Sequence, residues 1–376
     1  MSHENAIRTH IFSIPELLLE QADRTFENVQ KVFLKEDLVH IRKIVMTGCG
    51  YSYAAGMSAK YIFEKIARIP TEIPYSIDAS RHIDLSVIPP RNETMFIGVS
   101  NSGIVARIAE SMERFSRTGA TTVAFTGDSE SKCARYAKYT VDVSCPSLKR
   151  SLPLRGYVMT LLNCYAIAWN IAMVKGIASK TECNNFYEEL KELARDLEMK
   201  LPEIDEAISE FAVKVQDAKT YEFVGSGTEY AAAWIGRQQM AGQTGKMGLD
   251  CSTEDWLHST FFLSEPEKIG TMLFMPGRST SYSREREVFH FMLHLKRPLC
   301  VVSDLSELPE QGAILARVPY TDNRELYPLV DLIPVSLFAG KICELTGEEY
   351  SRGFRDNWDF SIGGRATEFS EIHIVL

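Results

Sequence analysis

The chain lacks several features that mark special classes of protein. Its 376 residues carry a net charge of −9, so there is no surplus of Lys and Arg of the kind that a broad nucleic-acid-binding surface needs. No apolar run reaches the roughly 18 residues that predict a transmembrane helix. The longest candidate, residues 161–174, is interrupted by Asn163 and Asn170 and is typical of a buried helix. We therefore expect a globular protein that binds neither nucleic acid nor membrane.

The cysteines and the N-terminus lack the patterns of a secreted or metal-binding protein. Eight cysteines are scattered without a CxxC pair or a Cys/His cluster at zinc spacing. Residues 1–12 contain no basic stretch followed by an apolar core, so they do not resemble a signal peptide. We expect reduced, mostly buried thiols, a cytoplasmic location, and neither a metal nor a cofactor.

The sequence is duplicated. Residues 44–56 (IVMTGCGYSYAAG) align with residues 221–233 (YEFVGSGTEYAAA), and Gly48 pairs with Gly225 at an offset of 225 − 48 = 177. Residues 94–102 and 121–129 align with 271–279 and 298–306 at the same offset. With 45% hydrophobic residues, the chain can bury two cores, and we expect two homologous domains of similar size.

Each copy alternates apolar runs with amphipathic stretches. In the first copy, strands are expected at 44–47, 95–99 and 122–125, and helices at 53–67 and 104–118. This alternation predicts βαβ units, a parallel sheet and a right-handed, doubly wound α/β sandwich. Residues 186–216 are expected to form a bridging helix, and the first 35 residues one or two helices that pack across the core.

Two loops of the first copy are candidate phosphate sites, because each follows an expected strand and precedes an expected helix. Gly50, Tyr51 and Ser52 form the end of the first loop, for which a tight turn alone remains the alternative. It does not continue as GxGxxG, since position 53 is Tyr, so a nucleotide-dependent dehydrogenase is not expected. The second loop contains four small residues, Ser100, Asn101, Ser102 and Gly103. Its alternative is a helix N-cap, although one Ser would suffice for that.

Three motifs resemble those of the tandem SIS-domain (sugar isomerase) proteins, above all the isomerase half of glucosamine-6-phosphate synthase and the fructosamine-6-phosphate deglycases. Residues 50–56 (GYSYAAG) resemble the family's GTSYxAG, and residues 100–103 (SNSG) resemble its SxSGxT phosphate loop. Residues 332–340 (LIPVSLFAG) resemble its IPxQLxA segment. The resemblance covers residues from about 35 to 350 and implies that the two loops hold the phosphate of a sugar.

The resemblance also implies an architecture: two SIS domains, each a three-layer αβα sandwich with a parallel, flavodoxin-like sheet. The expected parts are an N-terminal helical segment, a first SIS domain, a linking helix, a second SIS domain and a C-terminal tail, at residues 1–34, 35–180, 181–216, 217–350 and 351–376. A homodimer or higher homo-oligomer is implied by the resemblance alone. Position 2 is Ser and the first repeat begins early, so we expect no glutaminase domain.

Residues 253–259 (TEDWLHS) stand where relatives carry a GExxHGP-like segment, whose His opens the sugar ring. The resemblance therefore implies that His258 is a catalytic acid/base, with a structural imidazole as the alternative. Glu254 or Asp255 would be the base by default, and a carboxylate beside a His in a dry cleft could have the raised pKa that a base needs. Two adjacent acids could equally be a solvated helix cap.

The chain also departs from the family pattern. Val105 replaces the Thr that ends the phosphate loop, Tyr51 replaces the Thr of GTS, and Ser336 replaces the Gln of IPxQ. The usual helix Glu falls at Gly242, and its neighbours Gln239, Ala241 and Gln243 are not acids either. We expect a phosphosugar isomerase or deglycase that acts on a ketose or amino-sugar 6-phosphate by enediol-type proton transfer. The alternative is a non-catalytic sugar-phosphate-binding regulatory protein.

Overall fold

The structure is a computed structural model that describes residues 6–89, 91–146, 148, 153–348, 352, 367 and 370–375. The chain divides into two compact units. We call Leu17–Lys191 with Asp359–Leu376 the first domain, and Met1–Glu16 with Glu192–Trp358 the second. The boundary between Lys191 and Glu192 falls within one long helix, α7 (Lys180–Val215).

The first domain is built on a parallel sheet. Among its described residues, the strands have the order β2-β1-β3-β4-β5, and every neighbouring pair is parallel. The bounds are β1 Lys43–Gly48, β2 Thr71–Glu72, β3 Thr94–Val99, β4 Thr121–Thr126 and β5 Tyr139–Asp142. This is the flavodoxin-like order, in which the chain reverses its direction of strand addition between β1 and β3.

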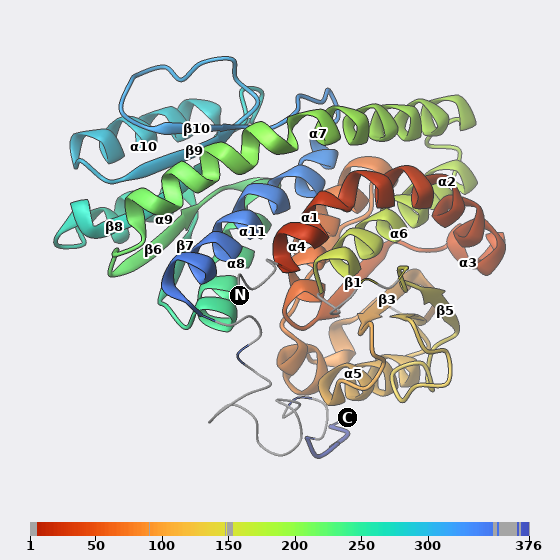
Figure 1. The fold of residues 1–376 in the computed structure, drawn as a ribbon. Helices are drawn as coiled ribbons and strands as arrows, with labels where there is room; N and C mark the ends of the chain where they lie inside the picture. The colour runs from red at the N-terminus through yellow and green to blue at the C-terminus, as the bar shows by residue number, and fades with distance from the viewer. Residues whose placement is uncertain are drawn as a thin grey trace. The chain divides into compact units, whose positions relative to one another are not determined.

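Helices cover both faces of this sheet because successive strand residues point to opposite sides. Val45 packs in the apolar cluster under α5, whereas Met46 faces Gly56 of α4. Figure 1 shows α5 on one side of the strands of this domain and α6 on the other. The described α-helices are α2 Ile14–Val32, α3 Lys35–Leu38, α4 Tyr51–Ile62, α5 Ala106–Arg117 and α6 Pro153–Val174. Short helical turns include a π-helix at Phe63–Ala67 directly after α4 and another at Asp78–His82.

The second domain repeats the plan. Its described strands have the order β10-β9-β8-β6-β7, again parallel throughout, which is the first sheet's order read from the other edge. The bounds are β6 Thr220–Val224, β7 Gly248–Cys251, β8 Ile269–Phe274, β9 Leu299–Ser303 and β10 Ile314–Arg317. Phe223 packs toward Gly236 of α8 and Phe338 of α11, whereas Val224 joins the cluster under α10.

The α-helices of the second part of the chain complete this sandwich. They are α7 Lys180–Val215, α8 Tyr230–Gln239, α9 Thr253–His258, α10 Tyr282–His294 and α11 Tyr327–Thr346. The N-terminal helix α1, Ala6–Phe12, also belongs to this unit and packs against α11. The expected doubly wound α/β sandwiches with flavodoxin-like sheets are therefore confirmed, and so is their duplication.

Among the described residues, two helices are long and apolar enough to cross a membrane by length and composition, α6 and the segment Arg324–Thr346. Their apolar windows are 83% and 94% buried inside the protein, which is typical of central core helices. The prediction that residues 161–174 form a buried helix is confirmed.

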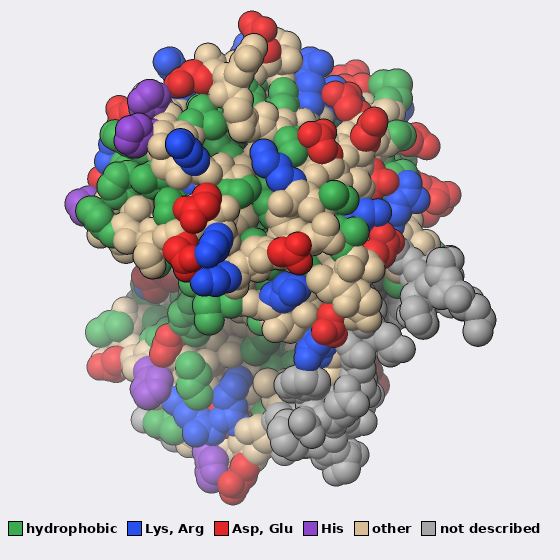
Figure 2. Space-filling view, turned by 60° about the vertical axis from the view of Figure 1, so that its left-hand side comes forward, with side chains coloured by type: hydrophobic (Ala, Val, Ile, Leu, Met, Phe, Trp, Pro, Cys, Tyr) green, Lys and Arg blue, Asp and Glu red, His purple; other side chains and the backbone are tan. Residues whose placement is uncertain are grey.

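On the face shown in Figure 2, acidic and basic side chains are interspersed over the upper part of the surface.

A short piece of the C-terminal tail lies along α5 in the first domain. The carbonyl of Thr367 accepts a hydrogen bond from the backbone of Ala106 at 3.1 Å. The backbone N–H of His373 donates to Glu110, a fully buried carboxylate that also pairs with Arg81 and Arg107. Most of the tail predicted at 351–376 lies outside the described residues.

Candidate phosphate-binding site

The two predicted phosphate loops begin side by side. In the parallel pair of β1 and β3, Gly48 stands opposite Val99, so both loops leave the sheet at the same carboxyl edge. This is also the point where the strand order reverses. Open α/β sheets bind ligands at such switch points, because the loops there diverge and leave a crevice.

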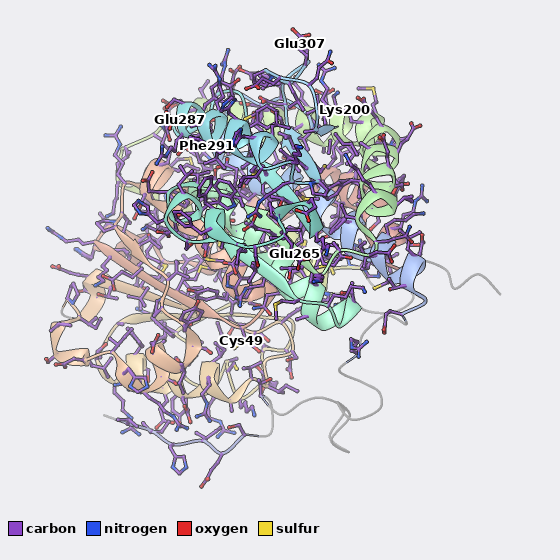
Figure 3. All side chains as sticks on the ribbon, turned by 90° about the vertical axis from the view of Figure 1, so that its left-hand side faces the viewer. Cys49, Lys200, Glu265, Glu287, Phe291 and Glu307 are labelled. Atoms are coloured by element: carbon purple, nitrogen blue, oxygen red, sulfur yellow. The ribbon has the colours of Figure 1, made fainter. Side chains whose placement is uncertain are left out.

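The first loop is a tight turn into α4, and Cys49 within it is labelled in Figure 3. Gly48 lies so close to Ser52 that an added Cβ would come within 2.6 Å of the Ser52 Cβ, and Gly50 adopts a φ of 57°. Both positions favour glycine. The turn brings Tyr51 and Ser52, both half-buried, onto the first turn of a 12-residue helix, whose N-terminus favours anions.

Two backbone hydrogen bonds join the second loop to the end of β4 and the residues directly after it. The Ser100 N–H donates to Phe125 at 2.9 Å, and the Asn101 carbonyl accepts from the Gly127 N–H at 2.9 Å. Gly103 has a φ of 69° and turns the chain back toward the sheet. Asn101 and Ser102 are exposed at the edge, whereas Ser100 is buried.

These residues do not cap α5, so the helix N-cap alternative is wrong. The N-cap position is Val105, which makes no side-chain capping bond, and the helix begins at Ala106. The backbone N–H of Ala106 is satisfied by Thr367 instead. The polar side chains of residues 100–102 are thus not consumed by helix capping.

Two hydroxyls are buried near this loop; one of them contacts the Cys133 thiol, and the other has no hydrogen-bond partner among the described residues. They are the Oγ atoms of Ser100 and Ser131, respectively. An added Cβ on Gly103 would come within 2.2 Å of the Ser131 side chain, so Ser131 packs directly under the loop. Buried polar groups normally find a hydrogen-bond partner, so the unpaired Ser131 hydroxyl is a candidate ligand contact beside the loop. Ser131 was not predicted from the sequence, because it follows β4 in a stretch without a recognisable motif.

The predicted catalytic residues lie on α9 in the second domain. Ser252 is the N-cap of this helix and accepts from the Asp255 N–H at 3.1 Å, so Asp255 belongs to the helix cap. His258 Nε2 lies 3.4 Å from Glu254 Oε1 on the next turn, and its side chain is 74% exposed. Trp256 is the buried anchor, and its indole N–H donates to Glu222 at 2.9 Å.

The expectation of a raised carboxylate pKa on this helix is wrong for Glu254. Hydrogen bonds from the Arg284 guanidinium, at 2.8 and 3.0 Å, lower the pKa of Glu254, and His258 adds to this effect. Within the second domain the carboxylate is solvent-exposed rather than enclosed in a dry cleft. An exposed carboxylate bound to a guanidinium is a weak base.

The corresponding loops of the second domain are not built for an anion. The Gly277 N–H, at the place of Ser100, donates to the carboxylate of Asp304 at 2.6 Å. Arg278, at the place of Asn101, is exposed and pairs with Asp322 at 2.6 Å. The first domain is therefore the better candidate for phosphate, as its sequence indicates.

Cavities and acidic clusters elsewhere do not compete with this assignment. A pocket of about 580 Å³ lies in the first domain beside β5 and α2, but none of the predicted site residues lines it. In the part of the chain that the structure describes, no group of three or more His, Cys, Asp or Glu side chains has the geometry of a metal site.

Comparison with known proteins bears on the first domain directly. Residues 37–168 match the family model of the SIS domain. The chain contains a SIS domain. This SIS domain includes both predicted phosphate loops. The recognition made from GYSYAAG and SNSG is thereby confirmed.

Curated relatives extend the similarity beyond this SIS domain. The chain is 26% identical over 353 residues to glutamine–fructose-6-phosphate aminotransferase (isomerizing) of Caldanaerobacter subterraneus subsp. tengcongensis, which covers 89% of this chain and 53% of the relative. It is 31% identical over 208 residues to the protein of that name from Clostridium tetani, covering 54% of this chain and 32% of the relative. The chain thus spans about half the length of the first of these relatives.

Solved structures share the fold of the whole chain. The C-terminal domain of glucosamine-fructose-6-phosphate aminotransferase from Francisella tularensis superimposes with a TM-score of 0.82 at 17% identity, covering 93% of this chain and 98% of that one. Glucosamine-6-phosphate deaminase from Thermotoga maritima gives a TM-score of 0.65 at 15% identity, covering 91% and 95%. The second domain is thus SIS-like in fold, although the family model matches only the first.

Proposed function

We propose that the first domain binds the phosphate of a ketose or amino-sugar 6-phosphate between the loops at residues 50–52 and 100–103. The observation that carries this proposal is the pairing of the two loops at the β1/β3 switch point, with the side chains of Asn101 and Ser102 exposed at that edge. The α4 N-terminus supplies a favourable dipole, and the hydroxyls and backbone N–H groups supply donors. The relatives named above act on sugar 6-phosphates by their printed names, which supports the same substrate class.

We further propose that the chain is an isomerase- or deglycase-type enzyme. Such a reaction opens the sugar ring, removes a proton next to the carbonyl and returns one to the neighbouring carbon. His258 is the proposed ring-opening acid/base, held by Glu254 at 3.4 Å. Glu254 and Asp255 remain the candidate bases, although the Arg284 contact argues against Glu254. His258 lies in the second domain.

A non-catalytic sugar-phosphate-binding protein is the second candidate, and particular residues favour it. Gly242 stands where the family has its helix Glu, and nothing lies within 4 Å of the position of an added Cβ there. Glu254 is exposed and bound by Arg284, so its lowered pKa makes it a poor substitute. Such a protein would bind phosphosugars without converting them.

A phosphosugar panel separates the two candidates. The purified chain is offered fructose 6-phosphate, glucosamine 6-phosphate and fructoselysine 6-phosphate, and both binding and turnover are measured. For an enzyme, His258→Ala should lower kcat by about 100-fold or more, because positioned acid–base groups contribute about 10²–10⁴-fold. KM should change little, since the phosphate contacts remain.

His290→Ala is the matched control, because His290 is another exposed histidine of the second domain that pairs with a glutamate, Glu310, at 3.0 Å. It should leave kcat unchanged. Turnover that survives His258→Ala would refute the acid/base role, and binding without turnover across the panel would favour the regulatory protein. The proposed homo-oligomer and cytoplasmic location need separate tests, by sedimentation and by fractionation of the source cells.

A further inference from the structure

The second domain buries a group of carboxyl side chains at the carboxyl edge of its sheet. Glu229 and Glu285 are fully buried, and Asp331 is 1% exposed. Glu229 follows β6, Glu285 lies on α10 after β8, and Asp331 lies on α11. We call these three residues the carboxyl cluster. Neither the proposed phosphate site nor α9 uses any of them.

One member of the carboxyl cluster, Glu229, occupies the second copy of the first phosphate loop. Glu229 stands at the place of Ser52, since 229 − 177 = 52. The backbones agree: an added Cβ on Gly48 would meet Ser52, and one on Gly225 would come within 2.9 Å of the Glu229 carbonyl oxygen. A carboxyl group in the second domain thus replaces a hydroxyl in the first, at one position of one fold.

The internal hydrogen bonds satisfy only part of the cluster. Glu229 Oε1 accepts from the Thr228 hydroxyl at 2.6 Å, and Glu285 Oε1 accepts from Ser279 at 2.7 Å. Among the described residues, one buried oxygen of each cluster member has no partner: Glu229 Oε2, Glu285 Oε2 and Asp331 Oδ2. A buried ionised carboxylate with an unpaired oxygen is costly, whereas a protonated carboxyl is much less so.

Charges around the cluster do not balance it. Arg324 is the facing cation, with Nη2 4.0 Å from Glu229 Oε1, and its Nη1 donates a hydrogen bond to the Thr280 hydroxyl at 3.2 Å. Asp304 faces the cluster as a further acid and is held by the Gly277 N–H and the Tyr327 hydroxyl, both at 2.6 Å. One guanidinium cannot neutralise the buried carboxyls if all of them are ionised.

The pKa directions agree with this charge count. Burial raises the pKa of Glu285 to about 8, and Glu229 adds to the increase, while Ser279 and Arg324 oppose it. Burial also raises the pKa of Glu229. It raises the pKa of Asp331 well above the usual range, and the charges of Glu229, Asp304 and Glu285 raise it further. Interacting carboxyls of this kind titrate as a group.

We propose that Glu229, Glu285 and Asp331 share protons at neutral pH, and that this carboxyl cluster makes the stability of the second domain depend on pH. A group whose folded-state pKa is raised holds its proton more tightly in the folded state. Its contribution is complete below the unfolded pKa, near 4.5 for Glu285, and is lost as the pH rises to about 8. The second domain should therefore become less stable across that range.

Hydrogen exchange of the full chain tests the proposal, because it reports on each domain separately. Protection factors of β8 amides are compared with those of β3 amides from about pH 5.5 to about pH 8.5, where one shared proton changes the opening equilibrium by up to about tenfold per pH unit. We expect protection in β8 to fall as pH rises and protection in β3 to fall less. Glu285→Gln keeps the acceptor for Ser279 and should flatten the β8 profile.

Glu265→Gln is the matched control. Glu265, labelled in Figure 3, is an exposed glutamate of the same domain, and Lys219 and Lys268 lower its pKa to about 2, so it does not titrate in the tested range. It should leave the β8 profile unchanged. A β8 profile that is equally steep in Glu285→Gln and in the parent would overturn the proposal. If Glu285→Gln does not fold, Asp331→Asn and the infrared band of protonated carboxyl in the parent replace it, and absence of that band at pH 7 would also overturn the proposal.

Discussion

At the scale of single residues, Gly103 has the most demanding position in the proposed phosphate site. Its φ of 69° is rare for other residues, and an added Cβ would come within 2.2 Å of Ser131. Gly103→Ala should therefore lower the free energy of unfolding by about 1–3 kcal/mol, from strain and overpacking together. Denaturant unfolding monitored by circular dichroism measures this change.

The same substitution at Gly242 is the control. It lies in a helical turn, and nothing stands within 4 Å of an added Cβ, so Gly242→Ala should change stability by no more than about 0.5 kcal/mol. Equal costs at the two glycines would contradict the close packing of Gly103 on Ser131. Phosphosugar binding should be weakened by Gly103→Ala alone.

Residue types could be predicted from the sequence where a motif fixes them. Ser100, Asn101 and Ser102 lie together at the sheet edge as expected from their position after an apolar run. Ser131 and the carboxyl cluster could not be found in this way, because their neighbours come from distant parts of the chain. Glu229 was the exception: the repeat offset already placed it opposite Ser52, and a carboxylate at a phosphate position is a signal that an alignment of the two copies can show.

At the scale of elements, α9 depends on a buried ion pair beneath it. Arg297 and Glu222 both have fully buried side chains, and Glu222 also accepts from Trp256, the anchor of α9. Burial raises the pKa of Glu222 and lowers that of Arg297, so each group needs the other. Arg297→Met should cost about 3–5 kcal/mol of unfolding free energy, because it leaves an uncompensated buried carboxylate.

An exposed pair in the same domain provides the control. Lys219 and Glu265 lie 2.7 Å apart with side chains 65% and 44% exposed, so Lys219→Met should cost less than about 1 kcal/mol. Urea unfolding of both variants measures the difference. A loss below about 1 kcal/mol in Arg297→Met would show that the buried pair does not hold α9 in place.

The central strands and helices could be predicted because the spacing of apolar residues along the chain indicates which side chains are buried. The strand expected at 95–99 is β3, Thr94–Val99, and the helix expected at 104–118 is α5, Ala106–Arg117. The edge strands were missed, since β2 has two residues and β5, β7 and β10 have four each, too few for a hydrophobic pattern. The raised pKa expected for Glu254 was wrong because Arg284 comes from α10, a contact that no local pattern predicts.

At the scale of the whole molecule, duplication explains why one fold is present twice with different chemistry. In the first domain, serine hydroxyls lie at the point where the strand order reverses. In the second domain, buried carboxyl side chains lie at the corresponding place. We expect the first switch point to favour an anion and the carboxyls at the second to repel one. We therefore expect one phosphosugar per chain, held by the first domain.

Calorimetric titration of the full chain with the phosphosugar that the panel identifies tests this claim most directly. We expect one phosphosugar-binding site per chain. Ser100→Ala with Ser102→Ala should weaken binding by at least about tenfold, since a hydrogen bond to a charged group contributes about 1.5–3 kcal/mol. Ser116→Ala, at the far end of α5, should leave the affinity unchanged. If the Ser100/Ser102 double variant binds the phosphosugar as tightly as the parent, the loop at residues 100–103 does not hold the phosphate.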